Sequence, residues 1–158
     1  MKKTILTVAL ALLLSAGLLR AHCQIPCGIY DDMLRVKLML EHVDTIEKSM
    51  KEITRLSQAE TPDWNQLVRW VSNKDHHADE LTDIVTYYFM TQRINPARND
   101  AGWGEKYINQ LTLLHAIMIH SMKAKQTLDL EHCVKLRELI NQFKDCYFGK
   151  EKAHEHKH

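Results

Sequence analysis

The chain has 158 residues, the usual size of one domain and enough to bury a hydrophobic core. Its 21 basic and 20 acidic residues nearly balance, so the charge does not indicate a nucleic-acid partner. Ten histidines and four cysteines make metal binding worth considering, because both side chains are common metal ligands.

Residues 1–21 have the pattern of a secretory signal peptide. Two lysines precede an apolar run from Ile5 to Leu14, and Ala21 is a small residue suited to the cleavage site. The run is short for a bilayer span, so a cleaved signal is favoured over a membrane anchor. Cleavage after Ala21 would make His22 the first residue. We therefore expect a periplasmic or secreted protein without a membrane partner.

Two helices are expected in the first part of the remaining chain. Over 31–55, apolar residues recur at spacings of three and four, which is typical of an amphipathic helix. Thr61 is expected to cap the second helix, with Pro62 at its first position and an end at Gln92 or Ile94. The expected core residues are Val36, Met39, Val43, Ile46, Met50 and Ile53 in the first helix, and Trp64, Leu67, Val71, Lys74, Ala78, Leu81, Val85 and Tyr88 in the second.

Two further helices are expected after a loop at 95–104, which is rich in glycine, proline, asparagine and aspartate. The third ends near Gln126, and Gly149 stops the fourth. The expected core residues are Ile108, Leu111, His115, Met118 and Met122, flanked by Leu114 and Ile117, in the third helix, and Cys133, Leu136, Ile140, Phe143 and Tyr147 in the fourth. Four helices with short links and no strand signal predict an all-α, antiparallel up-down four-helix bundle over 31–149.

Two groups of histidines lie away from the start of this bundle. His76, His77, Asp79 and Glu80 form a ligand-rich patch on the second helix, which is either a solvated face or a metal site. Residues 150–158 contain three more histidines and are expected to form a disordered tail.

The cysteines fall into two pairs. Cys133 and Cys146 are expected in one helix, where a rise of 1.5 Å per residue places them about 20 Å apart, too far for a disulfide. Cys133 is expected to be a buried apolar residue. Cys23 and Cys27 are close enough in sequence to close a small disulfide ring, and export would allow that bond to form.

The stretch HCQIPCGIY, directly after the expected signal cleavage, offers an alternative to the disulfide. The free α-amine and imidazole of His22, the backbone nitrogen of Cys23 and the thiolates of Cys23 and Cys27 can converge on one ion. Thiolates with nitrogen donors in a planar arrangement suit nickel(II) or copper(II), whereas zinc prefers tetrahedral sites. Pro26 is expected to turn the chain so that Cys27 returns to the metal, and Gly28 adds permissive backbone.

This stretch, followed by a four-helix bundle, resembles the nickel superoxide dismutase family. The residues that match the family's nickel hook, expected over 22–30, are His22, Cys23, Pro26, Cys27, Gly28 and Tyr30. The resemblance implies an enzyme that converts superoxide to dioxygen and hydrogen peroxide, with one nickel ion per chain cycling between Ni(II) and Ni(III). It also implies that His22, Cys23 and Cys27 are the metal ligands.

The resemblance assigns roles to two tyrosines. Tyr30 would line a small pocket over the metal, exclude larger reductants and order water for proton delivery. Tyr88 is the expected second pocket tyrosine, with a plain core aromatic as the alternative. The glutamate that orients the histidine ring in the family aligns near Met39, with Glu41 two residues on, and its arginine partner aligns with His77, so the resemblance does not assign the residues that orient the His22 ring.

The leading interpretation is therefore an exported nickel superoxide dismutase that assembles, like its family, into a homohexamer. Superoxide is the expected small-molecule partner. Two other interpretations fit the same residues: an exported helical bundle that binds copper or nickel without catalysis, and a structural bundle with a Cys23–Cys27 disulfide.

Overall fold

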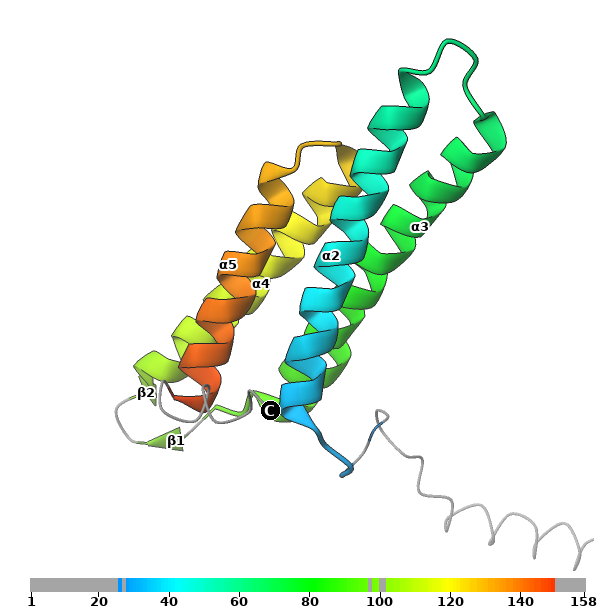
Figure 1. The fold of residues 1–158 in the computed structure, drawn as a ribbon. Coiled ribbons are helices and arrows are strands. Elements are labelled where there is room, and N and C mark those ends of the chain that lie inside the picture. Colours follow the sequence, from blue (N-terminus) through cyan, green and yellow to red (C-terminus); the bar gives the residue numbers. More distant parts are fainter. Residues whose placement is uncertain (1–25, 27, 97, 100–101, 150–158) are drawn as a thin grey trace, which may run out of the picture.

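The computed structural model describes residues 26, 28–96, 98–99 and 102–149, which form an up-down four-helix bundle as predicted. Its long elements are α2 (Asp32–Ser57), α3 (Trp64–Asp83), which continues as the π-helix η2 (Ile84–Arg93), α4 (Glu105–Gln126) and α5 (Glu131–Phe148). Consecutive helices run in opposite directions, with α2 beside α3 and α4 beside α5 (Figure 1). Because α2 also packs on α5 and α3 on α4, the four helices share one core.

Several predicted segments lie outside the described residues. They are the signal peptide (1–21), the hook residues His22, Cys23 and Cys27, and the tail (150–158). The domain boundaries drawn around them therefore stay predictions. In the described part of the chain, none of the helices is both long and apolar enough to cross a membrane.

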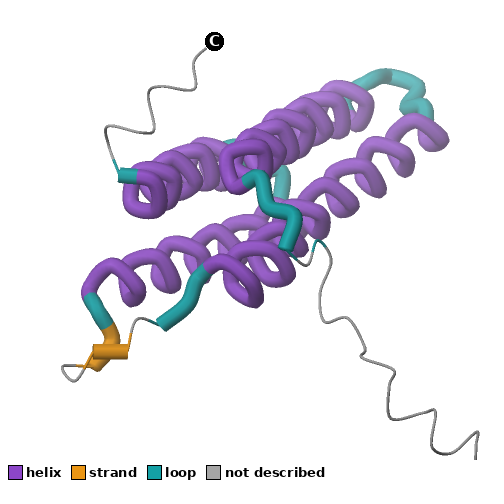
Figure 2. The backbone as a smooth tube through the Cα atoms, turned by 90° about the horizontal axis from the view of Figure 1, so that it is seen from below, coloured by secondary structure: helices purple, strands orange, loops and turns teal. Residues whose placement is uncertain are grey.

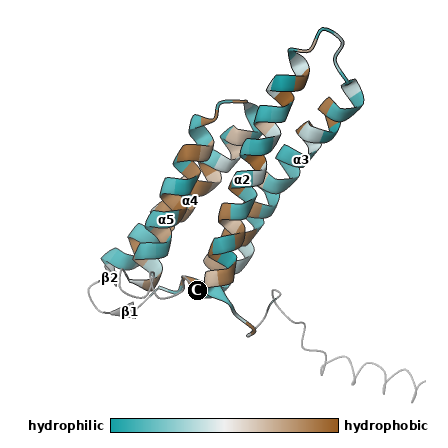
Figure 3. Ribbon diagram, viewed as in Figure 1, coloured by the Kyte–Doolittle hydropathy of each residue, from teal (hydrophilic) through white to brown (hydrophobic). Residues whose placement is uncertain are grey.

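The first and last helices bury the residues that the sequence predicts. Asp31 caps α2 by accepting a hydrogen bond from the Leu34 N–H (2.9 Å), and every expected core residue of this helix is buried. In α5 the expected seam is buried from Cys133 to Phe143, and Gly149 ends the helix with a φ of +83°. Figure 3 shows hydrophobic and hydrophilic residues alternating along each helix, as expected for helices that bury one side.

The buried side of α4 differs from the prediction. The buried residues of this helix are Gln110, Leu114, Ile117, Ser121 and Ala124. The predicted core residues Ile108 and Met122 are instead 50% and 46% exposed. Polar residues in the buried seam explain the error, because a hydrophobic pattern does not reveal them. Ser121 is accommodated because its hydroxyl donates to a backbone carbonyl of α3 at 2.8 Å.

The start of α3 also differs from the prediction. Asp63, and not Thr61, caps the helix, because its carboxylate accepts a hydrogen bond from the backbone N–H three residues later at 3.1 Å. Pro62 therefore precedes the helix. The first turns of α3 lie where α2 and α3 project past the other two helices (Figure 1), so the predicted core residues Trp64 and Val71 are 68% and 36% exposed.

Lys74 is a buried cation, with only 3% of its surface exposed. Its ammonium group donates to the Ala124 carbonyl (2.9 Å), to the Lys125 carbonyl and to the Asp75 carboxylate (2.9 Å). The last carbonyl groups of a helix have no partner within the helix, and a cation near them is stabilising. Lys74 thus joins α3 to the C-terminal end of α4.

The second helix ends as a π-helix, which the sequence did not predict. The i→i+5 hydrogen bonds include the one from the Ile94 N–H to the Phe89 carbonyl (2.8 Å). The loop that follows contains two short antiparallel strands, β1 (Arg98–Asn99) and β2 (Gly102–Trp103), where no strand was expected. Figure 2 shows these strands at one end of the bundle, between η2 and α4.

Candidate active site

A tight turn precedes α2. The Ile29 N–H donates to the Pro26 carbonyl at 2.8 Å, and Gly28 has a φ of +84°. A positive φ at the third position of a four-residue turn is typical of type II, which favours glycine there. The turn sets the direction in which Tyr30 approaches the bundle.

The two predicted pocket tyrosines lie side by side. The ring centroids of Tyr30 and Tyr88 are 5.9 Å apart, with the planes at 80°, an edge-to-face contact. The Arg93 guanidinium lies over the Tyr30 ring, 4.2 Å from its centroid, and the Tyr30 hydroxyl donates to Gln92 Oε1 at 3.4 Å. Tyr30 is 39% exposed and Tyr88 only 3%. Of this pair, Tyr30 is the one open to solvent.

Behind these rings, hydrogen bonds from three side chains converge on Asp32 in the first turn of α2. Its Oδ1 accepts from the Tyr88 hydroxyl (2.7 Å) and from Arg93 Nε (2.8 Å). Its Oδ2 accepts from Arg93 Nη2 (2.8 Å) and from the Tyr147 hydroxyl (2.8 Å). Asp32, Tyr88, Arg93 and Tyr147 are called the Asp32 cluster below. The cluster ties together the beginning of α2, η2 and the end of α5.

The protonation states of the Asp32 cluster follow from these contacts. Burial alone raises the pKa of Asp32, but the hydrogen bonds from Arg93, Tyr88 and Tyr147 outweigh it and hold that pKa below its usual value. Burial and the Asp32 carboxylate raise the pKa of Tyr88 well above its usual value and that of Tyr147 to about 12. At neutral pH the cluster therefore contains one carboxylate, one guanidinium and two neutral phenols.

The π-helix explains how Tyr88 and Arg93 reach the same carboxylate. Their positions differ by the i→i+5 spacing of a π-helix, so both side chains project from one side of η2. In an α-helix, with 3.6 residues per turn, the same spacing would separate them by about 140° around the axis. The wider turn therefore makes the bidentate Arg93–Asp32 contact compatible with the Tyr88–Asp32 hydrogen bond.

Another cation lies beside the tyrosine pair. The Arg35 guanidinium is 5.0 Å from the centroid of the Tyr88 ring. The charge of Arg93 is offset by Asp32, whereas Arg35 has no ion pair within the described part of the chain. The site therefore carries a positive charge close to Tyr88 that the bundle does not neutralise by direct pairing.

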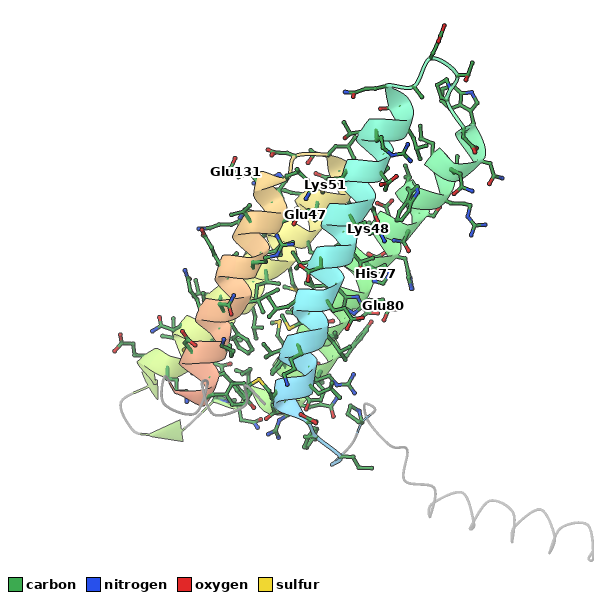
Figure 4. All side chains as sticks on the ribbon, viewed as in Figure 1. Glu47, Lys48, Lys51, His77, Glu80 and Glu131 are labelled. Carbon is green, nitrogen blue, oxygen red and sulfur yellow. The ribbon has the colours of Figure 1, made fainter. Side chains whose placement is uncertain are left out.

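The histidine-rich patch of the second helix takes part in contacts between helices. His77 faces His42 of α2 with their Nδ1 atoms 2.8 Å apart, and Asp79 forms an ion pair with Lys125 of α4 at 2.7 Å. Figure 4 shows His77 and Glu80 on α3, well away from the end at which α2 begins. Within residues 26, 28–96, 98–99 and 102–149, no group of three or more histidine, cysteine or acidic side chains is placed to hold a metal ion.

The two cysteines of α5 are free thiols. Cys133 is buried beside Met50, with the two sulfur atoms 3.8 Å apart, and Cys146 is half-buried. Burial raises the pKa of Cys133 to about 11, so its thiol is un-ionised at neutral pH. The predicted role of Cys133 as a buried apolar residue is confirmed.

A comparison with protein families matches residues 18–152 to the nickel-containing superoxide dismutases. The match includes the stretch at 22–30 and all four helices. The chain belongs to the nickel-containing superoxide dismutase family. Searches of curated proteins and of solved structures give no match.

A nickel-containing superoxide dismutase is an oxidoreductase with a nickel cofactor and superoxide as its substrate. The chemistry of the donors in His22, Cys23 and Cys27 fits this metal, since thiolates combined with nitrogen donors suit Ni(II). These residues lie outside the described part of the chain, so their assignment as ligands still rests on the sequence. The described part contributes Tyr30 and Tyr88, with Asp32 and Arg93 behind them.

The sequence did not predict that Asp32 and Arg93 support the pocket tyrosines of this dismutase, nor that Tyr147 donates to the same carboxylate. Tyr147 was assigned only to the core, and Arg93 fell within the expected end of a helix. The partners of Asp32 are 56, 61 and 115 residues away in the sequence, so no local spacing pattern links them. The one local signal is the presence of two successive aspartates at the start of α2. Asp31 alone caps the helix, so the cap does not account for Asp32.

Proposed function

We propose that this enzyme converts two superoxide ions and two protons to dioxygen and hydrogen peroxide at one nickel ion per chain, bound by His22, Cys23 and Cys27. The observation that carries the proposal is the position of these residues. In the sequence, His22 and Cys23 precede the turn from Pro26 to Ile29 that leads Tyr30 to the Asp32 cluster, and Cys27 falls between these two turn residues. The family match includes the whole stretch.

The proposed ligands combine nitrogen and anionic sulfur. His22 would bind through its α-amine and imidazole, Cys23 through its amide nitrogen and thiolate, and Cys27 through its thiolate. Anionic donors of this kind favour the higher oxidation state of a metal ion. When bound, nickel supplies an electron acceptor and an electron donor by alternating between Ni(II) and Ni(III).

Tyr30 is the proposed side chain on the substrate side of the site. Its exposed ring comes three residues after Cys27 in the sequence and would restrict entry to small reductants such as superoxide. Its hydroxyl proton points to Gln92 Oε1. Tyr88 is proposed to line the site with its ring, because its own hydroxyl is engaged by Asp32.

The charge near the tyrosines supports an anionic substrate. Superoxide carries one negative charge, and the Arg35 guanidinium beside the Tyr88 ring would attract it. Attraction of this kind raises the rate of encounter and weakens as salt is added. Arg35 is thus proposed to guide superoxide without contacting the metal.

We also propose that residues 1–21 direct export and that the mature enzyme begins at His22 in the periplasm or outside the cell. The signal-like sequence supports this location. A homohexamer is proposed from the family resemblance. The exposed apolar side chains Trp64, Val68 and Val134 on the outer surfaces of the helices are compatible with contacts between subunits.

Intact-mass and metal analysis of protein purified from its native compartment tests the proposal. We expect an N-terminus at His22, one nickel per chain and two free thiols at Cys23 and Cys27. A protein with bound copper and no dismutase activity would instead be a metal-binding bundle. A metal-free protein lighter by two hydrogens would have a Cys23–Cys27 disulfide and a structural role.

An added residue before His22 tests the proposed amine ligand. The extension converts the α-amine into an amide, so dismutation should be lost although both thiolates remain. An extension of the opposite end, after His158, is the matched control and should leave dismutation unchanged. Equal activity of the two extended proteins would rule out ligation by the amine.

A further inference from the structure

The carboxylate of Asp32 has no free acceptor position. The two oxygens of a carboxylate offer about four lone-pair sites. The Tyr88 and Tyr147 hydroxyls and two nitrogens of Arg93 occupy four such sites at 2.7–2.8 Å. Asp32 cannot accept a hydrogen bond or a proton from a substrate without losing one of these partners. Any role in the reaction must therefore act through them.

Two of the three partners are the side chains that contact the Tyr30 ring. Arg93 covers its face at 4.2 Å, and Tyr88 meets it edge to face at 5.9 Å. The polar contact of Tyr30 itself, from its hydroxyl to Gln92, is long at 3.4 Å. The orientation of Tyr30 is thus set mainly by two neighbours, both of which are hydrogen-bonded to Asp32.

The third partner, Tyr147, differs in its surroundings. It donates to the same carboxylate at 2.8 Å, but its ring contacts are with Phe89, Phe143 and Phe148. A purely stabilising role of Asp32 would make the Tyr88 and Tyr147 hydroxyls equivalent. A role in placing Tyr30 would make them different.

We infer that Asp32 is a positioning residue for dismutation. Its carboxylate holds Arg93 and Tyr88 against the Tyr30 ring and so fixes the orientation of Tyr30 beside the proposed nickel ligands. The inference rests on the proposed function, in which Tyr30 borders the place where superoxide reacts. Asp32→Asn keeps the size of the side chain but replaces an acceptor oxygen by an NH2 group that faces other donors. The bidentate grip on Arg93 is then lost.

The decisive experiment compares three variants of the full chain loaded with nickel: Asp32→Asn, Tyr88→Phe and the matched control Tyr147→Phe. The two tyrosine variants each lose one hydroxyl that donates to the same carboxylate. Because misplacement of a group at a reacting centre is costly, we expect kcat to fall about tenfold in Asp32→Asn and Tyr88→Phe. We expect Tyr147→Phe to stay within about twofold of the wild type, with a similar loss of thermal stability to Tyr88→Phe.

Two results would overturn the inference. One is an equal fall in kcat for Tyr88→Phe and Tyr147→Phe, which would reduce the carboxylate to a stabilising contact. The other is an unchanged kcat in Asp32→Asn. If Asp32→Asn does not fold, the two tyrosine variants decide. A wild-type protein that takes up no nickel or does not dismutate superoxide would contradict the proposed function. An active wild type whose variants give either of the two results above would contradict only the inference about Asp32.

A second measurement does not depend on nickel. In the nickel-free protein, removal of the Asp32 charge should lower the pKa values of Tyr88 and Tyr147, which burial and that charge raise. Phenolate absorbance at about pH 11 should therefore increase in Asp32→Asn relative to the wild type. No increase would show that Asp32 does not hold the two hydroxyls, and the inference would fall with that contact.

Discussion

At the end of the bundle where α2 begins, hydrogen bonds from three side chains converge on Asp32, whereas the opposite end is a hairpin of α2 and α3 that projects past the other helices. At the first end Tyr88 and Phe89 pack with their rings 5.1 Å apart. At the opposite end Trp64 and Val68 are exposed. Three distant parts of the chain thus meet at one carboxylate at the end next to the hook.

This difference shows how a small bundle can support a site at one end. The ion pair of Glu52 with Arg55 (2.7 Å), near the projecting end, joins neighbouring turns of one helix. Such exposed pairs contribute only about 0.2–0.5 kcal/mol. The contacts of Asp32 instead join three elements, α2, η2 and α5. Substitutions near the hook should therefore affect activity and stability far more than substitutions at the projecting end.

The largest expected effect comes from replacing a proposed metal ligand. Cys23→Ser exchanges a thiolate for a hydroxyl that does not ionise, so dismutation should fall by at least about 100-fold. Helical content should stay unchanged because the hook precedes the bundle. Activity assays and circular dichroism measure the two quantities, and Val68→Ser at the projecting end is the control that should keep activity. Unfolding of Cys23→Ser would show that the hook is part of the scaffold.

The next largest effect is on stability, at a core ring that packs against two members of the Asp32 cluster, Tyr88 and Tyr147. Phe89 is fully buried and packs on Phe143 with the centroids 4.8 Å apart. Phe89→Ala should lower the free energy of unfolding by about 3–5 kcal/mol, because it leaves a cavity. Trp64→Ala removes an exposed ring and should change it by no more than about 0.5 kcal/mol. Denaturant unfolding of both variants measures the contrast, and similar losses would contradict it.

A smaller effect is expected for the cation beside the tyrosines. Arg35→Gln should lower kcat/KM about two- to threefold at low ionic strength, because one attractive charge is lost, and the difference should shrink as salt is added. Lys48→Gln, farther along α2, removes the same charge and serves as the control. Steady-state kinetics over a series of salt concentrations provide the measurement. If the two variants respond alike, the effect comes from net charge and not from the position of Arg35.

The smallest effect concerns the histidine pair between α2 and α3. Burial lowers the pKa of His42 and that of His77, and each is lowered further by a neighbouring histidine, whereas Glu41 and Glu80 act in the opposite direction. The folded state therefore binds protons less readily than the unfolded chain, in which histidine titrates near 6.5. Stability from this pair should be complete above about pH 6.5 and decrease as the pH falls further.

Thermal unfolding at about pH 7.5 and about pH 5 measures this dependence. His42→Gln should show a smaller decrease in melting temperature between the two conditions than the wild type, because one of the two coupled groups no longer titrates. His115→Gln is a control outside the pair. An equal decrease in His42→Gln and the wild type would show that the pair does not titrate in this range.

The sequence predicted those parts of the fold in which burial follows hydrophobicity. The seams of α2 and α5 consist of apolar residues, and both predictions are confirmed. In α4 the seam includes Gln110 and Ser121, which become acceptable only through partners on other helices. In α3 the expected core residue Trp64 is exposed, because its neighbours depend on how far α4 and α5 extend.

The candidate site, like the fold, could be predicted from the sequence only in part. A motif with fixed spacing predicts the hook residues and the role of Tyr30 from the sequence alone, and that assignment stays a prediction. The support around Tyr30 depends on Asp32, whose partners come from other elements, and on the π-helical turn that brings Tyr88 and Arg93 to one side. Neither contacts between distant residues nor an i→i+5 turn is encoded in the period of hydrophobic residues.

The π-helix η2 also affects how relatives of this chain are to be aligned. In an ordinary α-helix, residues four positions apart lie on the same face. A relative that forms the same contact with an α-helix would therefore carry its arginine four residues after the tyrosine, one fewer than the spacing from Tyr88 to Arg93. An alignment without a one-residue gap in η2 would pair Arg93 with the wrong residue, and the ancestry of this contact would be missed.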